Sequence, residues 1–284
     1  MRTFAGIDES YALFDNASVL LQSIPYDGTS TWGKGADKGF ERFLTASENM
    51  ELFDIESGFE VYKKGIHILP EHLENRSPEQ LFHSVYKLTR SLLKTGKFIT
   101  FFGGEHSISI GIIKAFLESF PGLSILQLDA HADLRPEYLG SRYNHACALH
   151  EASLQGNLVQ VGIRSMDVSE QPFLVREKCF FAGDIYRNTN WIDRSIDLLG
   201  DTVYITLDLD VFDPAVMPAT GTPEPGGMDW HTMIRYLKRV FMKRNVVGFD
   251  IVELAPVNGL FFPEFLVAKL YYKMLTYKFI NHEQ

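Results

Sequence analysis

The chain contains six short, nearly continuous apolar runs, each about as long as a β-strand. They are rich in β-branched and aromatic residues and span residues 18–24, 98–102, 123–128, 158–163, 203–209 and 246–252. Continuous runs, as opposed to alternating ones, are typical of parallel strands that are buried on both faces of a sheet. Such a sheet must be covered by helices on both faces, so the runs predict a three-layer α/β/α fold.

Segments with a helical pattern lie between several of these runs. The clearest begins after Ser77, which can cap the helix, with Pro78 in the first turn and Gly96 as the stop. Further helices are predicted over residues 108–120, 230–243 and 263–279. No repeat or low-complexity linker divides the chain. We therefore expect one α/β domain over residues 1–284, with a mainly parallel sheet and helices on both faces.

Charge and cysteine content narrow the class of protein. The 284 residues carry a formal net charge of −9, which argues against nucleic acid and anionic membranes as partners and is compatible with a cationic substrate. Cys147 and Cys179 have no paired spacing, which indicates a reducing compartment, and we expect the cytoplasm. No apolar stretch approaches the length of a membrane span, and the N-terminus has no signal-peptide pattern.

Polar residues follow four of the predicted strands, at the carboxyl ends where α/β sheets bind their ligands. The segment Asp-Ala-His-Ala-Asp at 129–133 places three metal-ligating side chains in five positions. If the chain stays extended there, alternate residues face one side, and the same spacing recurs at Asp208 and Asp210. Paired buried carboxylates are costly unless a cation neutralises them. The alternative is a polar loop with a capping Asp and a chance His.

The other strand ends add further polar residues. Glu105 and His106 follow the run at 98–102, and Glu253 follows the run at 246–252. Convergence of the strand ends would bring together two imidazoles and four carboxylates, which is too many for one tetrahedral zinc. Two metals that share bridging carboxylates would suit this set, and its many oxygens favour Mn²⁺ over Zn²⁺, Fe²⁺ or Ni²⁺. The predicted metal ligands are His106, Asp129, His131, Asp133, Asp208 and Asp210.

These four segments, in this order, resemble those of the ureohydrolase family, which comprises arginases, agmatinases and their relatives. The resemblance covers most of the chain, including the segments 24–36 and 218–227, and the continuation at 134–140 looks most like agmatinases. It implies an arginase-like fold, a homo-oligomer (trimer or hexamer) and two Mn²⁺ ions per chain. It also implies hydrolysis of a guanidinium substrate to urea and an amine, a reaction that needs a strong nucleophile because resonance stabilises the guanidinium carbon.

The resemblance further implies a division of the ligands between the two metals. Asp129 and Asp208 would bridge the metals, and Asp133 would also transfer the proton of the nucleophile to the leaving amine. The first metal would be held by His106, Asp129, Asp133 and Asp208, and the second by His131, Asp129, Asp208 and Asp210.

Three more residues have implied roles at the substrate. Glu253 would bind the guanidinium through two parallel hydrogen bonds, Thr222 would line the same pocket, and His145 would relay protons to solvent. Two departures from the family pattern stand out. Many members have Asp where this chain has Glu105, and Asn144-His145-Ala146 replaces the commoner Ser-His-Gly or Leu-His-Gly.

The loop after residue 133 bears on the choice of substrate. Agmatine, which would give putrescine and urea in polyamine biosynthesis, is predicted because two positive charges suit an anionic site. Arg135 stands where arginases have an Asn that binds the amino-acid group, and Ser141 keeps the spacing of their Ser. Glu137 could bind an ammonium, which favours agmatine or aminopropylagmatine. Arg135 could instead bind a carboxylate, which favours guanidinobutyrate, or the two side chains could pair with each other.

Other functions are alternatives to the ureohydrolase prediction. A metal-dependent deacetylase of the related fold uses one zinc and does not need His106 and Asp133. A ureohydrolase acting on another guanidine, arginine included, and a degenerate member serving as a binding or regulatory subunit are further alternatives. Arg164 is expected to be a structural salt-bridge partner and Asp250 a loop support. The histidines without a partner motif are expected to be ordinary: His67, His72, His83, His150, His231 and His282.

Overall fold

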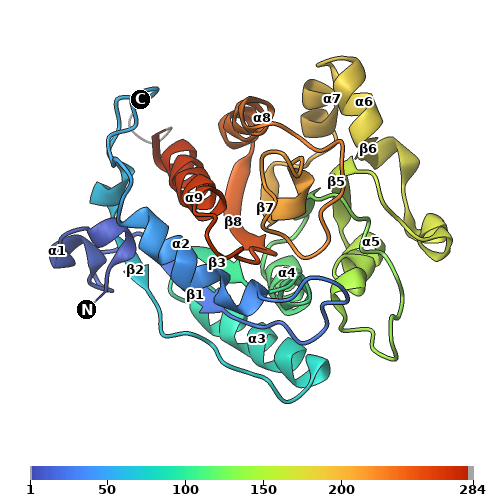
Figure 1. The fold of residues 1–284 in the computed structure, drawn as a ribbon, viewed down its shortest axis with the longest axis horizontal. Helices are drawn as coiled ribbons and strands as arrows, with labels where there is room; N and C mark the ends of the chain where they lie inside the picture. The colour runs from blue at the N-terminus through green and yellow to red at the C-terminus, as the bar shows by residue number, and fades with distance from the viewer. Residues whose placement is uncertain (1, 281–284) are drawn as a thin grey trace.

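Eight parallel strands form one sheet in the computed structural model, which describes residues 2–280 (Figure 1). The strands are β1 (Val19–Ile24), β2 (Ile66–Ile68), β3 (Phe98–Gly103), β4 (Ser124–Leu128), β5 (Asn157–Ile163), β6 (Cys179–Phe181), β7 (Thr202–Asp208) and β8 (Asn245–Val252). Their order is β2-β1-β3-β8-β7-β4-β5-β6, and each neighbouring pair is parallel. The predicted parallel sheet and its six strands are confirmed. The edge strands β2 and β6 escaped prediction because three residues are too few to show a pattern.

Helices connect the strands, and most of the longer ones follow the predicted segments. They are α1 (Glu9–Ala12), α2 (Gly39–Ser47), α3 (Pro78–Leu93), α4 (Ile108–Ser119), α5 (His150–Gln155), α6 (Ala182–Arg187), α7 (Trp191–Asp197), α8 (Trp230–Lys243) and α9 (Phe262–Ile280). Ser77 caps α3 as predicted, because its hydroxyl accepts a hydrogen bond of 3.2 Å from the backbone N–H of Gln80. The helix α2 and the short helices α1, α5, α6 and α7 were not predicted from the sequence.

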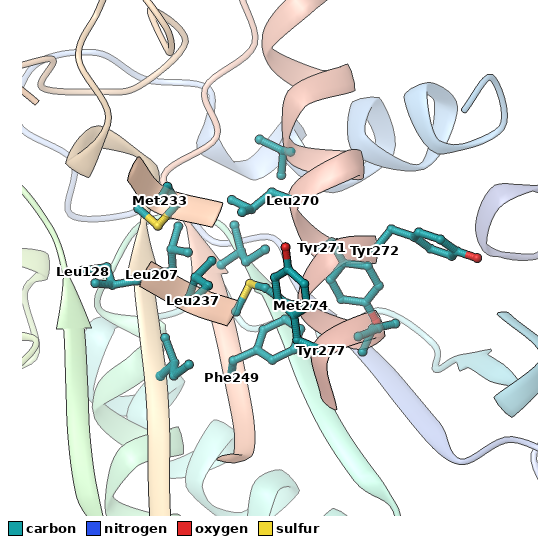
Figure 2. Close-up of a cluster of buried hydrophobic side chains, with 14 of the residues drawn as sticks. Leu128, Leu207, Met233, Leu237, Phe249, Leu270, Tyr271, Tyr272, Met274 and Tyr277 are labelled. Atoms are coloured by element: carbon teal, nitrogen blue, oxygen red, sulfur yellow. The ribbon is translucent and has the colours of Figure 1, made fainter. Parts of the chain in front are cut away.

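Two apolar layers cover the two faces of the sheet. On one face, α2, α7, α8 and α9 pack on the strands, and on the other α3, α4 and α5 do so. Successive residues of β1 divide between the faces, since Leu20 joins the second layer and Leu21 the first. Figure 2 shows part of the first layer, which includes Phe249 of β8 and Tyr271 of α9. The centroids of these two rings lie 5.6 Å apart. The central strands are therefore buried on both faces, and polar side chains gather beyond their ends.

None of the helices within residues 2–280 combines the length and hydrophobicity that a membrane crossing requires. Cys147 and Cys179 are both buried and unbonded to each other. The predicted role of His282 lies outside the described residues.

Candidate metal centre and active site

The four polar strand ends are neighbours in space. Strands β3, β8, β7 and β4 lie side by side at the centre of the sheet, although β4 and β7 are separated in sequence by more than 70 residues. Because all four run in the same direction, their carboxyl ends meet at one edge. His106 follows β3, Asp129 follows β4, Asp208 ends β7 and Glu253 follows β8. The sheet order thus assembles residues that the sequence predicted as one site.

The first group of candidate ligands surrounds one ring nitrogen of His106. Nδ1 lies 3.0 Å from a carboxylate oxygen of Asp133, 3.2 Å from one of Asp129 and 3.3 Å from one of Asp208. His106 is 1% exposed, yet among the described residues Nδ1 makes no hydrogen bond of acceptable geometry. An imidazole nitrogen and three carboxylates directed at one point are the donor set of a divalent cation.

The other ring nitrogen of His106 has a defined hydrogen-bond partner. Nε2 lies 2.9 Å from the hydroxyl of Thr206, and that hydroxyl donates to the buried carboxylate of Asp250 at 2.7 Å. With its proton given to Asp250, the Thr206 oxygen must accept, so Nε2 carries the proton of the neutral imidazole and Nδ1 is the nitrogen that can bind a metal. Asp250 supports the His106 ring through Thr206 of β7, and not a loop as predicted. A metal fits this arrangement because it replaces repulsion among lone pairs with coordination.

A second group of ligand atoms lies beside the first. It comprises Asp129, His131 and Asp210, whose ligand atoms lie within 4.8 Å of one another. His131 Nδ1 is 2.9 Å from an oxygen of Asp210. Asp129 belongs to both groups, as a bridging carboxylate should, whereas Asp208 groups only with His106 and Asp129 among the described residues.

Turns, and not an extended strand, bring these ligands together. Strand β4 ends at Leu128, and Asp133 has a φ of 53°, a left-handed conformation that Asp tolerates better than most residues. Asp210 lies in a short 3₁₀ helix, with its N–H donating to Asp208 at 3.0 Å. The expectation that alternate residues of an extended chain would face the metal is therefore wrong. Side-chain hydrogen bonds to neighbouring N–H groups favour such turns over continued strands.

Without bound metal, this cluster would take up protons. Burial, followed by the charges of Asp210 and Asp133, raises the pKa of Asp129 to about 7. Burial likewise raises the pKa of Asp208 well above its usual range. Burial opposes protonation of His131, yet the carboxylate of Asp210 and its neighbours raise the pKa of that imidazole to about 11. Bound divalent cations would supply the missing positive charge and keep the carboxylates ionised.

Glu253 is fixed against the loop that carries His106. Its N–H donates to the carbonyl of Gly104 at 2.8 Å, and its carboxylate accepts from the N–H of His106 at 3.0 Å. Gly104 is required there, because a Cβ at this position would lie 1.8 Å from the carbonyl oxygen of Tyr26. Glu253 has a φ of 68°, a conformation that costs about 1–2 kcal/mol for a residue other than glycine. Such strain is typical of functional sites.

A cavity of about 250 Å³ opens onto this centre. The predicted site residues that line it are His131, Asp133, His145, Asp208, Asp210, Thr222 and Glu253. His106 and Asp129 do not line the cavity, because they are buried beneath the residues that do. The structure therefore places the candidate substrate residues and the candidate metal ligands around one space.

The outer part of the cavity differs from the sequence-based expectation. The guanidinium of Arg135 lies 4.4 Å from the ring centroid of Tyr138 and 3.6 Å from the carboxylate of Asp167. Glu137 is exposed and does not line the cavity. The cavity lining therefore does not support its part in binding an ammonium, and the ion pair of Arg135 is with Asp167 and not with Glu137.

Ser141 also lies outside the cavity lining. Its backbone exchanges two hydrogen bonds of 3.0 Å with Tyr138, and its hydroxyl accepts from the N–H of Tyr143. It therefore shapes the loop, and the spacing that it shares with the arginase serine does not bring it to the cavity.

Asp167 was not predicted from the sequence, and Arg164 has a different role from the predicted one. Asp167 follows the carboxyl end of β5 by four positions and lines the cavity, so the rule applied to the other strand ends could have found it. The prediction that Arg164 forms a structural salt bridge is wrong. Its guanidinium donates to backbone carbonyls instead, including those of Asp210 at 2.6 Å and Glu224 at 2.8 Å. These bonds hold the loop that carries Asp210.

The fold and the site define a three-layer α/β protein with a carboxylate-rich candidate metal centre at the carboxyl edge of its sheet. The sequence profile of the arginase family matches residues 17–276. The chain belongs to that family, whose members have a binuclear metal centre and hydrolyse guanidino compounds. The resemblance to ureohydrolases that the strand-end motifs indicated is thereby confirmed. The prediction that the protein is a hydrolase is confirmed as well.

Individual relatives cover nearly the whole chain. An N(1)-aminopropylagmatine ureohydrolase of Thermus thermophilus is 37% identical over 275 residues, which span 95% of this chain and 93% of that protein. The protein of the same name from Synechocystis is 34% identical over 281 residues, spanning 95% and 92%. The agmatine ureohydrolase structure of Thermoplasma volcanium has a TM-score of 0.87 at 29% identity and covers 100% of this chain and 96% of that one.

Proposed function

We propose that this protein hydrolyses a guanidinium group with a cationic tail, releasing urea and an amine. The observation that carries the proposal is the bare Nδ1 of buried His106 facing three carboxylates. This donor set adjoins a cavity lined by Glu253, whose carboxylate a bound guanidinium would keep ionised.

The described residues fit two metal ions. His106, Asp129, Asp133 and Asp208 would hold one. Asp129, His131 and Asp210 would hold the other, and the family resemblance adds Asp208 as its fourth ligand. The predominance of oxygen ligands supports Mn²⁺ in both positions. When bound, the two ions supply the Lewis acidity that activates water at neutral pH.

The remaining chemistry belongs to side chains that face the cavity. Glu253 binds and orients the planar guanidinium with Thr222 beside it, which holds the guanidinium carbon in place for attack. Asp133 accepts a proton from the attacking water and delivers it to the leaving amine. His145, half-buried at the cavity wall, exchanges protons with solvent, as suits an imidazole.

The outer cavity supports a substrate whose tail is an amine. Asp167 adds a carboxylate there, and Arg135 beside it is partly neutralised by the same side chain. N(1)-aminopropylagmatine is the first candidate, because the two relatives described above that carry its name match this chain over more than nine-tenths of their own length. Agmatine, the substrate predicted from the sequence, is the second candidate, which the Thermoplasma volcanium structure supports.

A substrate panel tests this proposal. Purified protein loaded with Mn²⁺ should release urea from N(1)-aminopropylagmatine and agmatine with a much higher kcat/KM than from guanidinobutyrate or arginine, and should contain two metals per chain. A protein that binds one zinc and releases no urea from any of the four would contradict it, and would favour the deacetylase alternative.

Replacing Asp167 with Asn should lower kcat/KM for amine-tailed substrates about 3- to 5-fold, because solvent screens a charge pair at the mouth of a cavity and leaves a modest contribution. n-Butylguanidine, which lacks the amine, serves as the matched substrate and should lose less than about twofold. Steady-state urea release measures both. Equal losses with the two substrates would show that Asp167 does not recognise the tail.

We also propose that residues 1–284 form one domain, that the protein works in the cytoplasm and that it assembles as a trimer or hexamer. The single sheet and the family match over residues 17–276 support the first point. The two free thiols suit a reducing compartment. The oligomeric state is an expectation from the family resemblance, and analytical ultracentrifugation would measure it.

A further inference from the structure

Behind His145 lies a pair of buried residues that the proposed reaction does not use. Thr29 is 8% exposed and Glu105 is fully buried. The Thr29 hydroxyl oxygen lies 2.8 Å from Glu105 Oε1 and 3.2 Å from His145 Nδ1, and it also accepts the backbone N–H of His145 at 3.0 Å. One hydroxyl therefore connects a buried carboxylate with the ring and the backbone of a cavity-lining histidine.

The donors around Glu105 indicate that its carboxylate accepts every one of these bonds. Backbone N–H groups of Thr29 and Ser107 donate to it at 3.2 and 2.8 Å, and the Ser107 hydroxyl lies 2.9 Å away. Backbone N–H groups only donate, so both oxygens of Glu105 already act as acceptors. A carboxylate surrounded by donors in this way attracts the hydroxyl proton of Thr29 as well.

The position of that proton decides which nitrogen of His145 is protonated. Since the Thr29 hydroxyl donates to Glu105, its oxygen serves only as an acceptor toward His145. Nδ1 must therefore carry the hydrogen in the neutral imidazole, and Nε2 is left with a free lone pair. Because Nδ1 is hydrogen-bonded to Thr29, Nε2 is the nitrogen that is available to the cavity.

We propose that Thr29, held by Glu105, is a positioning residue that fixes the orientation and the tautomer of His145 so that Nε2 can accept a proton in the cavity. This inference deepens the proposed function and rests on the proton-transfer role given there to His145.

Two substitutions at position 29 separate the hydroxyl from the shape of the side chain. Thr29→Val keeps the volume and removes the hydroxyl, and it should lower kcat about tenfold, in the range seen when a supporting partner of a functional histidine is lost. KM and metal content should be unchanged. Thr29→Ser restores the hydroxyl and should return kcat to within about twofold of wild type. Equal losses in the two variants would overturn the proposal.

A double-mutant cycle tests whether Thr29 acts through His145. If it does, Thr29→Val should cause no further loss of kcat in a His145→Ala background. A loss of the same factor in both backgrounds would show that Thr29 acts on the site independently, and the inference would fail while the role of His145 stands.

A spectroscopic measurement decides the tautomer independently of turnover. Protein labelled with ¹⁵N-histidine and loaded with diamagnetic Zn²⁺ should show His145, assigned by its loss in His145→Ala, with a protonated Nδ1 and an unprotonated Nε2. Thr29→Val should shift the populations toward protonated Nε2. Protonated Nε2 in the wild type would overturn the inference. If the spectra agree but His145→Ala retains full activity, the positioning is upheld and the proposed role of His145 fails.

Discussion

Asp129→Asn should remove bound metal and nearly abolish urea release. Asp129 is fully buried and is the one ligand shared by both candidate metal groups among the described residues. An amide in its place supplies no charge to either ion, and loss of one member of a buried ionic contact typically costs about 3–5 kcal/mol. That figure corresponds to a loss of about 100-fold to more than 1000-fold in kcat/KM. Metal analysis and steady-state kinetics on the same preparation would measure both effects.

Thermal unfolding gives this variant a second readout. Chelation should lower the Tm of the wild type, because metal binds only the folded site, and should leave the Tm of Asp129→Asn nearly unchanged. Asp15→Asn, an exposed substitution, is the matched control and should behave as wild type. A fully active Asp129→Asn that retains two metals would contradict the proposed bridging role.

The shifted pKa of the Asp129 carboxyl also predicts how the stability of the metal-free protein depends on pH. Because burial and neighbouring carboxylates raise the pKa of Asp129 from 3.8 to about 7, the folded state holds a proton that the unfolded chain has lost over this range. Stability should therefore fall as the pH rises from about 4 to about 7. Asp129→Asn should weaken that fall, and bound metal should remove it. Denaturant titrations at several pH values would measure the effect.

The sequence could predict the sheet and the ligand types because both depend on local patterns. Continuous apolar runs marked six buried strands, and each of the four central strands ended in residues with metal-binding chemistry. The parallel direction of those strands then brought His106, Asp129 and Asp208 to one edge without further assumptions. Strand order itself, in which β8 and β7 lie between β3 and β4, came only from the structure.

What the sequence could not predict depends on turns and on long-range contacts. Asp133 reaches His106 because its backbone is left-handed at φ 53°, a conformation that no spacing rule reveals. Arg135 pairs with Asp167, 32 positions away, and not with nearby Glu137. Thr29 contacts Glu105 and His145 from a loop that belongs to a different strand end. Each of these contacts depends on how loops pack, for which sequence pattern carries no signal.

Glu253→Gln should reduce kcat/KM by about 100-fold or more, with metal still bound. The loss corresponds to about 3 kcal/mol, within the range for removing one partner of a buried, hydrogen-bonded charge pair. Glu253 is 9% exposed and lines the cavity together with Asp208 and Asp210. A neutral amide keeps the side-chain shape but replaces an acceptor with a donor, so the two parallel hydrogen bonds to a guanidinium are lost. Urea release and metal content would measure the two quantities.

Metal retention decides how the loss is interpreted, because Glu253 also accepts a hydrogen bond from the backbone of His106. The Gln side chain can keep that bond through its carbonyl oxygen, so the His106 loop and its metal should stay in place. Low activity with two metals bound then assigns the loss to the substrate, whereas low activity with one metal lost would assign it to the His106 loop. Glu177→Gln, an exposed change, should match the wild type. Wild-type turnover in Glu253→Gln would refute guanidinium binding by this residue.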